Sequence, residues 1–458
     1  MNTQTLNKGH HVTDTFLTQN EMKEQSVYQR LCNQEATIGL VGLGYVGLPI
    51  ALEFAKSFRT IGYDINASRI GLMKQGIDPS GELDSKAFEN KNIHFTSASE
   101  TLDKADVIVV AVPTPVSKEN EPDLMPLTKA CEAIAVSIGK GNIIIFESTV
   151  YPGCTEEVCI PILEKVSGYK CNEDFWVGYS PERINPGDKV HTLTNITKIV
   201  SGSDEYAQRE IFQIYNHIID AGIHIAPSMK VAEAAKIVEN TQRDVNIALM
   251  NELSTFFNTI GINTHDVLEA AGTKWNFLNF YPGLVGGHCI GVDPYYLIHK
   301  AASMGMNLGV IGESRKINDL MPQHVVDQVE NGLARQGKSL NQSKVLVLGA
   351  TFKENVSDLR NSKAAEMCQI LVKKAKQLDI IDPNADAEEM VKYYGLSIAE
   401  VMTDHYDVIV YAVNHEEFDH ITWEFIKSIR STKTVIFDFK RLLGHPDAND
   451  EKTLYLTL

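Results

Sequence analysis

The chain lacks the marks of several large protein classes. It has 42 basic against 59 acidic residues and a formal net charge of -17, whereas nucleic acid is bound by basic surfaces. Its longest apolar run, at residues 107–112, is far too short to cross a bilayer. Residues 1–34 are polar and of mixed charge, unlike a secretory signal. We therefore expect a cytoplasmic protein with neither nucleic acid nor a membrane as its partner.

Cysteine is also scarce. The seven cysteines, an odd number, are scattered over 458 residues without a dense framework. This favours free thiols in a reducing compartment over disulfides. Cys154, Cys159 and Cys171 do not have the spacing of a zinc site, so we expect no metal and interpret them as small buried hydrophobic residues.

The chain does contain one strand pattern twice. Short runs rich in Val and Ile, separated by helical lengths, predict parallel strands buried on both faces. The runs lie at residues 37–41, 60–64, 106–112 and 142–146, and again at 344–348, 378–382, 407–413 and 434–437. The sequence therefore predicts an α/β fold with two doubly wound, Rossmann-like parallel-sheet domains.

Between these two units the sequence becomes helical. One helix is predicted from an N-cap at Ser228 to a stop at Gly261, and a second helical stretch from about Pro294 to Gln336. We expect a long-helix middle domain that dimerises, with a monomer joined by a helical linker as the alternative. The predicted divisions are a flexible or loosely docked polar extension at 1–36, a Rossmann domain at 37–226, the helical domain at 227–335 and a second α/β domain at 336–458.

A dinucleotide fingerprint follows the first predicted strand, where the chain reads Gly42-Leu43-Gly44-Tyr45-Val46-Gly47. Gly42 allows a tight turn, Gly44 lets the backbone approach a pyrophosphate, and Gly47 permits close packing of the next helix, whose N-terminus attracts the phosphates. Asp64 ends the next strand, where a carboxylate binds the adenosine ribose and repels a 2′-phosphate. The pattern predicts NAD as the cofactor, rather than NADP.

The chemistry is indicated by Cys289, which lies in a glycine-rich run between His288 and Asp293. A thiolate is a nucleophile, and neighbouring cations favour it. On the middle helix Lys236 and Asn240 are four positions apart and share one face, so that they can hold an oxyanion. These residues point to an oxidation that passes through a covalent thioester. The alternatives are a buried, inert Cys289 and a solvated lysine and asparagine.

Polar side chains also follow the strands. In the first unit they are Thr114, Thr149 and, on a proline-bounded loop, Glu182 and Arg183. In the second unit the first turn contains only one glycine, so we expect no dinucleotide there. Lys353 and Arg360 instead supply cations beyond a strand end, which suits a phosphorylated substrate. Each cation is as readily interpreted as a solvated surface charge, and each loop alone as a turn.

Together these motifs resemble the UDP-glucose/GDP-mannose dehydrogenase family, NAD-dependent enzymes that oxidise the primary alcohol of a sugar nucleotide to a carboxylate. The similarity extends from about Thr37 into the C-terminal region. The motifs occur in the order GLGYVG, VPTP, EST, SPER, AEAAKIVEN, GGHCIGVD and FKENVSDLR. The resemblance implies an N-terminal NAD domain, a helical dimerising middle domain, a C-terminal domain that helps bind the UDP-sugar, and a homodimer or dimer-based oligomer.

The resemblance also implies roles for single residues. Cys289 is expected as the nucleophile and Asp293 as the group that helps to activate water. The remaining expected roles are oxyanion stabilisation by Lys236 and Asn240, placement of water and protons by Thr149 and Glu182, and substrate contacts by Lys353 and Arg360. We further expect Tyr45, Val46, Arg69, Thr114 and Thr149 at the cofactor, and Glu182, Arg183, Lys236, Asn240 and His288 at the substrate.

One departure from the family pattern bears on the substrate. UDP-glucose dehydrogenases carry a second glutamate soon after the SPE motif, where this chain has Pro186. The run SPERINPG, with His288 before the cysteine, is similar to the branch that acts on 2-acetamido sugars. We therefore expect four-electron oxidation of UDP-N-acetylglucosamine or UDP-N-acetylgalactosamine to the uronic acid. Alternatives are UDP-N-acetylmannosamine or UDP-glucose as substrate, a single-oxidation dehydrogenase of the hydroxyacid type, and a non-catalytic NAD- or sugar-nucleotide-binding regulator.

Overall fold

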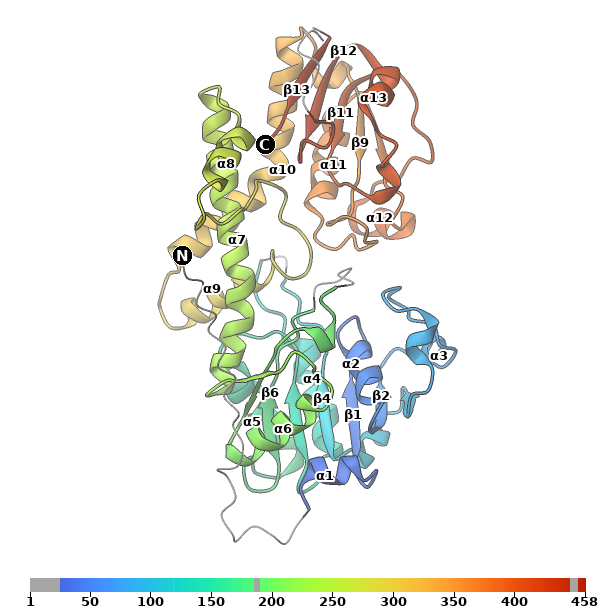
Figure 1. Ribbon diagram of the computed structural model, residues 1–458, viewed down its shortest axis with the longest axis vertical. Helices are drawn as coiled ribbons and strands as arrows, with labels where there is room; N and C mark the ends of the chain where they lie inside the picture. Colours follow the sequence, from blue (N-terminus) through green and yellow to red (C-terminus); the bar gives the residue numbers. More distant parts are fainter. Residues whose placement is uncertain (1–24, 118, 185–189, 445–451) are drawn as a thin grey trace, which may run out of the picture.

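The computed structural model describes residues 25–117, 119–184, 190–444 and 452–458. Figure 1 shows an α/β unit at each end of the molecule, with long helices running between them. The expected fold class, two parallel-sheet units joined by long helices, is thus confirmed. Within the described ranges no helix is both long and apolar enough to span a bilayer.

The N-terminal sheet has eight strands in the order β3-β2-β1-β4-β5-β6-β7-β8. Its neighbours pair in parallel except β6 and β7, which are antiparallel. The central strands are buried on both faces because helices cover both sides. The bounds are β1 (Thr37–Val41), β2 (Arg59–Tyr63), β3 (Ile93–Thr96), β4 (Val107–Val110), β5 (Ile143–Phe146), β6 (Trp176–Tyr179), β7 (Lys198–Gly202) and β8 (Ile223–Ile225).

The C-terminal sheet has five parallel strands in the order β10-β9-β11-β12-β13. In both sheets the strand order reverses beside the first strand, β1 or β9, and open α/β sheets bind ligands at the carboxyl ends of the strands at such a point. The bounds are β9 (Lys344–Leu348), β10 (Gln377–Ile381), β11 (Tyr406–Tyr411), β12 (Arg430–Asp438) and β13 (Thr453–Leu456).

Helices of the N-terminal unit include one inside the segment expected to be loosely docked. This helix, α1 (Val27–Cys32), buries Val27 and Leu31, and Tyr28 N donates to Glu210 Oε2 at 2.9 Å. The expectation is therefore wrong for residues 25–36, and residues 1–24 lie outside the described part. The other helices are α2 (Gly47–Phe54), α3 (Ala67–Met73), α4 (Met125–Ser137), α5 (Ile160–Ser167) and α6 (Glu205–Asn216), and in the C-terminal unit α11 (Lys363–Lys374), α12 (Ala387–Tyr394) and α13 (Trp423–Ile429).

The middle of the chain forms α7 (Met229–Thr259), α8 (Thr264–Gly272), α9 (Asp293–Ser303) and α10 (Gly309–Arg335). Ser228 caps α7 as expected, since its side chain accepts from Val231 N at 3.3 Å. The second helical stretch is not one continuous helix, because the chain turns at Gly305, whose φ is +73°. The helix α7 packs along both α9 and α10.

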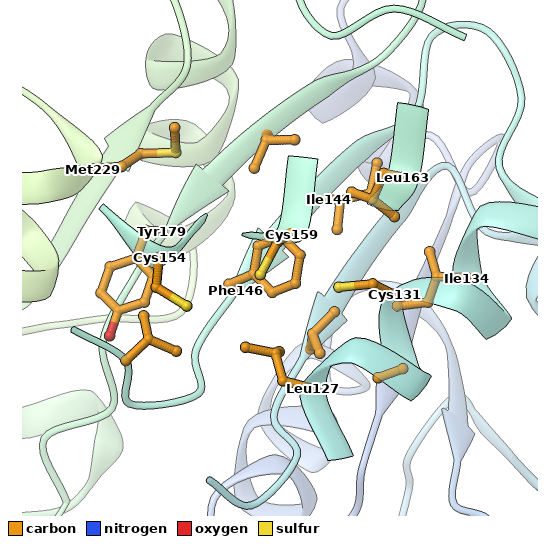
Figure 2. Packing of buried hydrophobic residues seen from close by; sticks show 14 of the residues in the cluster. Leu127, Cys131, Ile134, Ile144, Phe146, Cys154, Cys159, Leu163, Tyr179 and Met229 are labelled. Carbon is orange, nitrogen blue, oxygen red and sulfur yellow. The ribbon is translucent and has the colours of Figure 1, made fainter. Parts of the chain in front are cut away.

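The core beside the N-terminal sheet contains three of the cysteines. Figure 2 shows Cys131, Cys154 and Cys159 among Phe146 and Tyr179, and each of these five side chains is almost fully buried. Cys154 and Cys159 are thus the small buried residues that were expected, whereas Cys171 is half-buried. All seven thiols are free, and the described residues contain no group of three or more His, Cys, Asp or Glu side chains arranged to hold a metal.

Candidate active site

The glycine turn after β1 has the geometry that a dinucleotide needs. Gly42 has a φ of +88°, and a Cβ added at Gly47 would lie 1.9 Å from the Gly42 carbonyl oxygen. A Cβ at Gly44 would meet nothing within 4 Å, so this backbone is open to a ligand. Asp64 Oδ2 accepts from Leu43 N at 2.9 Å, and Arg69 Nη2 donates to the carbonyl of Leu43 at 3.1 Å. The open turn, the helix N-terminus and the carboxylate all fit NAD.

Two of the expected hydroxyl residues lie together at the carboxyl ends of β4 and β5. Thr114 Oγ1 donates to the Thr149 carbonyl at 2.7 Å. Tyr296, on α9, donates to the Thr114 carbonyl at 2.7 Å. The helix that follows the cysteine loop therefore holds the loops beside the cofactor turn.

The cysteine loop is fastened to α7 by a buried polar contact. Asn240 Nδ2 donates to Asp293 Oδ2 at 2.6 Å, and Asp293 N donates to the Cys289 carbonyl at 2.9 Å. Lys236, one turn earlier on α7, is also buried. Burial raises the pKa of Asp293, while the Lys236 ammonium and the Asn240 amide lower it. The structure therefore brings these four expected residues into one cluster.

Glu182 is buried in the loop after β6, with its carboxylate tightly held. Its Oε1 accepts from the backbone N–H groups of Arg183 and Ile184, both at 2.6 Å. The Arg183 guanidinium pairs with Glu239 on α7 at 2.7 Å, which places it against the helix and not in open solution. Pro186, the departure from the family pattern, lies outside the described residues.

The C-terminal unit meets the cysteine loop through His288. His288 Nδ1 lies 3.1 Å from Asp358 Oδ2, and Arg360 Nη2 lies 2.6 Å from the same oxygen. Arg360 is therefore already paired, and Lys353 lies half-buried in the same loop. Burial lowers the pKa of His288, but the hydrogen bond to Asp358 and the neighbouring Cys289 outweigh it and raise the pKa to about 9.

The hydroxyl of Tyr45, in the cofactor turn, lies where all these segments meet. Burial raises its pKa well above the usual value, and Cys289 raises it further. Arg360 lowers the same pKa, while Asp293 and Glu182 raise it. Charged groups of the cysteine loop, the loop after β6 and the C-terminal unit thus act on one hydroxyl of the cofactor turn.

Several residues of the site were missed from sequence. Lys198 on β7 is buried and lies 2.5 Å from Glu147 and 3.4 Å from Glu182, and Tyr215 also donates to Glu147. Glu233 on α7 is buried and accepts from the loop after β5, with Thr155 Oγ1 at 2.6 Å. The sequence signal that could have indicated these residues is a single charged residue beside apolar ones, such as Lys198 before Ile199 and Val200.

Fold and site together define a dinucleotide-dependent dehydrogenase in which the cofactor turn packs against the cysteine loop. Residues 36–219 match the NAD binding domain of the UDP-glucose/GDP-mannose dehydrogenase family, residues 230–320 its central domain and residues 346–445 its UDP binding domain. The chain belongs to this family and is an NAD-dependent nucleotide-sugar 6-dehydrogenase. The family and reaction class expected from the motifs are confirmed.

Similar proteins cover nearly the whole chain. It is 48% identical over 419 residues to protein CapL of Staphylococcus aureus, which covers 91% of this chain and 99% of the relative. It is 48% identical over 411 residues to UDP-N-acetyl-D-glucosamine 6-dehydrogenase of Salmonella typhi. That alignment covers 89% of this chain and 97% of the relative. The structure of UDP-D-ManNAc dehydrogenase from Pyrococcus horikoshii aligns with a TM-score of 0.83 at 29% identity. The alignment covers 92% of this chain and 98% of that protein.

Substitutions in the glycine turn separate packing from cofactor binding. We expect Gly47→Ala to lower the free energy of unfolding by about 3 kcal/mol, because its Cβ overlaps a backbone carbonyl. Gly44→Ala has open space and should change that free energy by less than about 0.5 kcal/mol. It should still weaken NAD binding at least about tenfold. Urea denaturation and NAD titration measure both effects, and equal stability losses would contradict the assignment.

Lys198 offers a test of the buried ion pair. We expect Lys198→Met to lower the free energy of unfolding by about 3–5 kcal/mol, since it leaves the Glu147 carboxylate buried without its cation. The double variant Lys198→Met/Glu147→Gln removes both charges and should recover most of the loss in urea denaturation. No recovery would show that the lysine acts through its packing alone.

The raised pKa of His288 predicts a pH dependence of stability. The folded state holds this proton up to a pH of about 9, whereas the unfolded imidazole loses it near its ordinary pKa. The contribution of this proton to the free energy of unfolding is therefore fully present below that ordinary pKa. It is lost as pH rises through about 9. Between the ordinary pKa and a pH of about 9, the free energy of unfolding of the wild type should fall as pH rises. This fall should exceed that of His288→Gln by about 1.4 kcal/mol per pH unit. The free energies are measured by urea denaturation at several pH values, and the same pH dependence in both proteins would contradict this prediction.

Proposed function

We propose that the enzyme oxidises the C6 primary alcohol of UDP-N-acetylglucosamine to the carboxylate, using two NAD+ and a covalent intermediate on Cys289. The packing of the cysteine loop against the cofactor turn, α7 and the C-terminal unit is the observation that carries this proposal. The ring centroids of Tyr45 and His288 are 4.7 Å apart, Asn240 donates to Asp293 at 2.6 Å, and His288 Nδ1 lies 3.1 Å from Asp358 Oδ2. This packing gathers a nucleophile, carboxylates and a phosphate-binding cation beside the cofactor turn. The 48% identity to a UDP-N-acetyl-D-glucosamine 6-dehydrogenase supports the choice of sugar.

The first stage makes an aldehyde that stays bound. NAD+ supplies the hydride acceptor in both oxidations. The Lys236 ammonium and Asn240 amide stabilise the alkoxide oxygen as the alcohol loses its proton. Thr149 and Glu182 position the water that carries this proton away. The turn at Gly42 would hold the NAD pyrophosphate, and the hydroxyls of Thr114 and Thr149 would help to position the substrate beside the cofactor.

The second stage passes through Cys289. Its thiolate adds to the aldehyde carbon, and Lys236 and Asn240 hold the oxyanion of the resulting thiohemiacetal. Loss of the second hydride leaves a thioester, which water hydrolyses with the help of Asp293 and Glu182, releasing the Cys289 thiol. The sum is alcohol, two NAD+ and water to carboxylate, two NADH and three protons.

The C-terminal unit is assigned to the UDP moiety. It carries the family's UDP binding domain, and its Lys353 and Arg360 follow the first strand of the sheet, at the edge where such folds bind ligands. Guanidinium and ammonium groups there match a diphosphate. UDP-N-acetylgalactosamine is the second candidate, because epimers differ only in the direction of one hydroxyl.

We also propose a homodimer built on the middle helices. Large apolar side chains are exposed along this region, among them Leu249 and Phe256 on α7 and Trp275 and Leu278 in the segment after α8. Exposed apolar clusters of this kind mark interaction surfaces. We place the enzyme in the cytoplasm, where NAD and UDP-sugars are available, as a step in polysaccharide synthesis. Sedimentation at several protein concentrations tests the dimer.

The stoichiometry of the reaction tests the proposed function. We expect two NADH for each UDP-N-acetylglucosamine consumed, measured by absorbance and by chromatography of the nucleotide sugars. UDP-N-acetylgalactosamine, UDP-N-acetylmannosamine and UDP-glucose serve as comparison substrates, and a higher kcat/KM for one of them would reassign the sugar. One NADH would indicate a single oxidation, and binding without NADH would favour a regulator.

The role of Cys289 is tested by Cys289→Ser. We expect this variant to stall after the aldehyde or adduct stage and to lose at least about 10³-fold in the rate of acid formation, since a serine hydroxyl is a far weaker nucleophile than a thiolate. Mass spectrometry of the bound and released sugar nucleotide identifies the stage. Full conversion to the acid by Cys289→Ser would remove the cysteine from the mechanism.

A further inference from the structure

His288 occupies the point where three parts of the chain meet. Its ring centroid lies 4.7 Å from that of Tyr45 in the cofactor turn and 5.9 Å from that of Phe352 in the C-terminal unit. Its own position is next to Cys289 in the cysteine loop. The side chain is only 15% exposed, so water does not substitute for these contacts.

The imidazole is held from the C-terminal side by a fixed carboxylate. Asp358 Oδ2 lies 3.1 Å from His288 Nδ1. The carboxylate is in turn oriented by Arg360, whose Nε and backbone N each lie 2.9 Å from Oδ1. The charged or titratable groups that act on this imidazole are Asp358, Cys289, Arg360 and Asp293, and the Tyr45 ring packs against it. Lys236 and Glu239 act on Asp293, and Glu182 acts on Tyr45.

The other ring nitrogen of His288, Nε2, is buried and lacks a geometrically well-formed hydrogen bond within the described residues, although buried polar groups are nearly always paired. The balance of charges keeps the ring protonated at neutral pH, so both nitrogens are donors. Nδ1 donates to Asp358, which leaves the Nε2–H available. After Asp358, it is Cys289, the next residue, that raises the pKa of this ring.

We propose that Asp358, His288 and Cys289 form a thiol-activating relay across two domains, in which Asp358 orients protonated His288 so that it stabilises the Cys289 thiolate. This inference rests on the proposed function of Cys289 as nucleophile. The imidazolium acts by charge and keeps its proton when the thiolate adds to the aldehyde. Because Asp358 belongs to the C-terminal unit, the thiol reaches full reactivity only when that unit is docked on the cysteine loop.

Alkylation of the full-length enzyme by iodoacetamide tests the relay without substrate or cofactor. The rate at Cys289 is followed by peptide mass spectrometry from mildly acidic to alkaline pH in the wild type, His288→Gln and Asp358→Asn. Both variants should shift the midpoint of the profile upward by about one pH unit and react about tenfold more slowly at neutral pH. The matched control is His405→Gln, which removes an exposed imidazole paired with Asp404 at 3.2 Å and should behave as the wild type.

A His288→Gln profile that overlies the wild-type profile would overturn the relay. A shift in His288→Gln without one in Asp358→Asn would overturn its cross-domain part. Thermal unfolding checks that each variant folds, and if one does not, the other carries the test. Two NADH per sugar together with an unshifted His288→Gln profile would reject the relay and keep the proposed function. A shifted profile in an enzyme that reduces no NAD with any UDP-sugar would support the relay and reject that function.

Discussion

A row of buried polar side chains along α7 joins this helix to the N-terminal unit, to the cysteine loop and to α10. Glu233, Lys236, Asn240, Asp244 and Asn251 are all buried, and their spacing keeps them near one face of the helix. A buried polar group is costly unless it is paired. Each of these side chains except Lys236 is hydrogen-bonded to a neighbouring segment, so moving any segment would leave such a group unpaired.

The consequence for the site is that the cysteine loop is fastened at both ends. Before the cysteine, the Asn251 amide exchanges two hydrogen bonds with the backbone of Gly283, at 3.0 and 2.8 Å. After it, Asn240 binds Asp293. Between these points the loop lies against the C-terminal unit so closely that a Cβ at Gly286 would be 2.6 Å from the Asn361 carbonyl oxygen. The glycines before Cys289 are therefore required by packing between domains as well as by access to the thiol.

Much of this arrangement was readable from local patterns, and the failures have physical causes. The central strands and the cap at Ser228 were predictable because continuous apolar runs and helix caps are local signals. The edge strand β8 reads Ile-His-Ile and has no such run. The ion pair of Lys198 with Glu147 joins β7 to the loop after β5, and no local pattern tells a buried charge from a solvated one.

The sequence by itself determined the chemistry available to this protein: a glycine turn for NAD, a cysteine in a glycine loop, and a lysine and an asparagine one turn apart. Tertiary structure decided which groups act on each other. It placed Asp358 against His288 and Arg360 against Asp358, and it packed the Tyr45 ring against His288. Burial and distance set these interactions, and both are properties of packed segments remote in sequence, so no spacing along the chain encodes them.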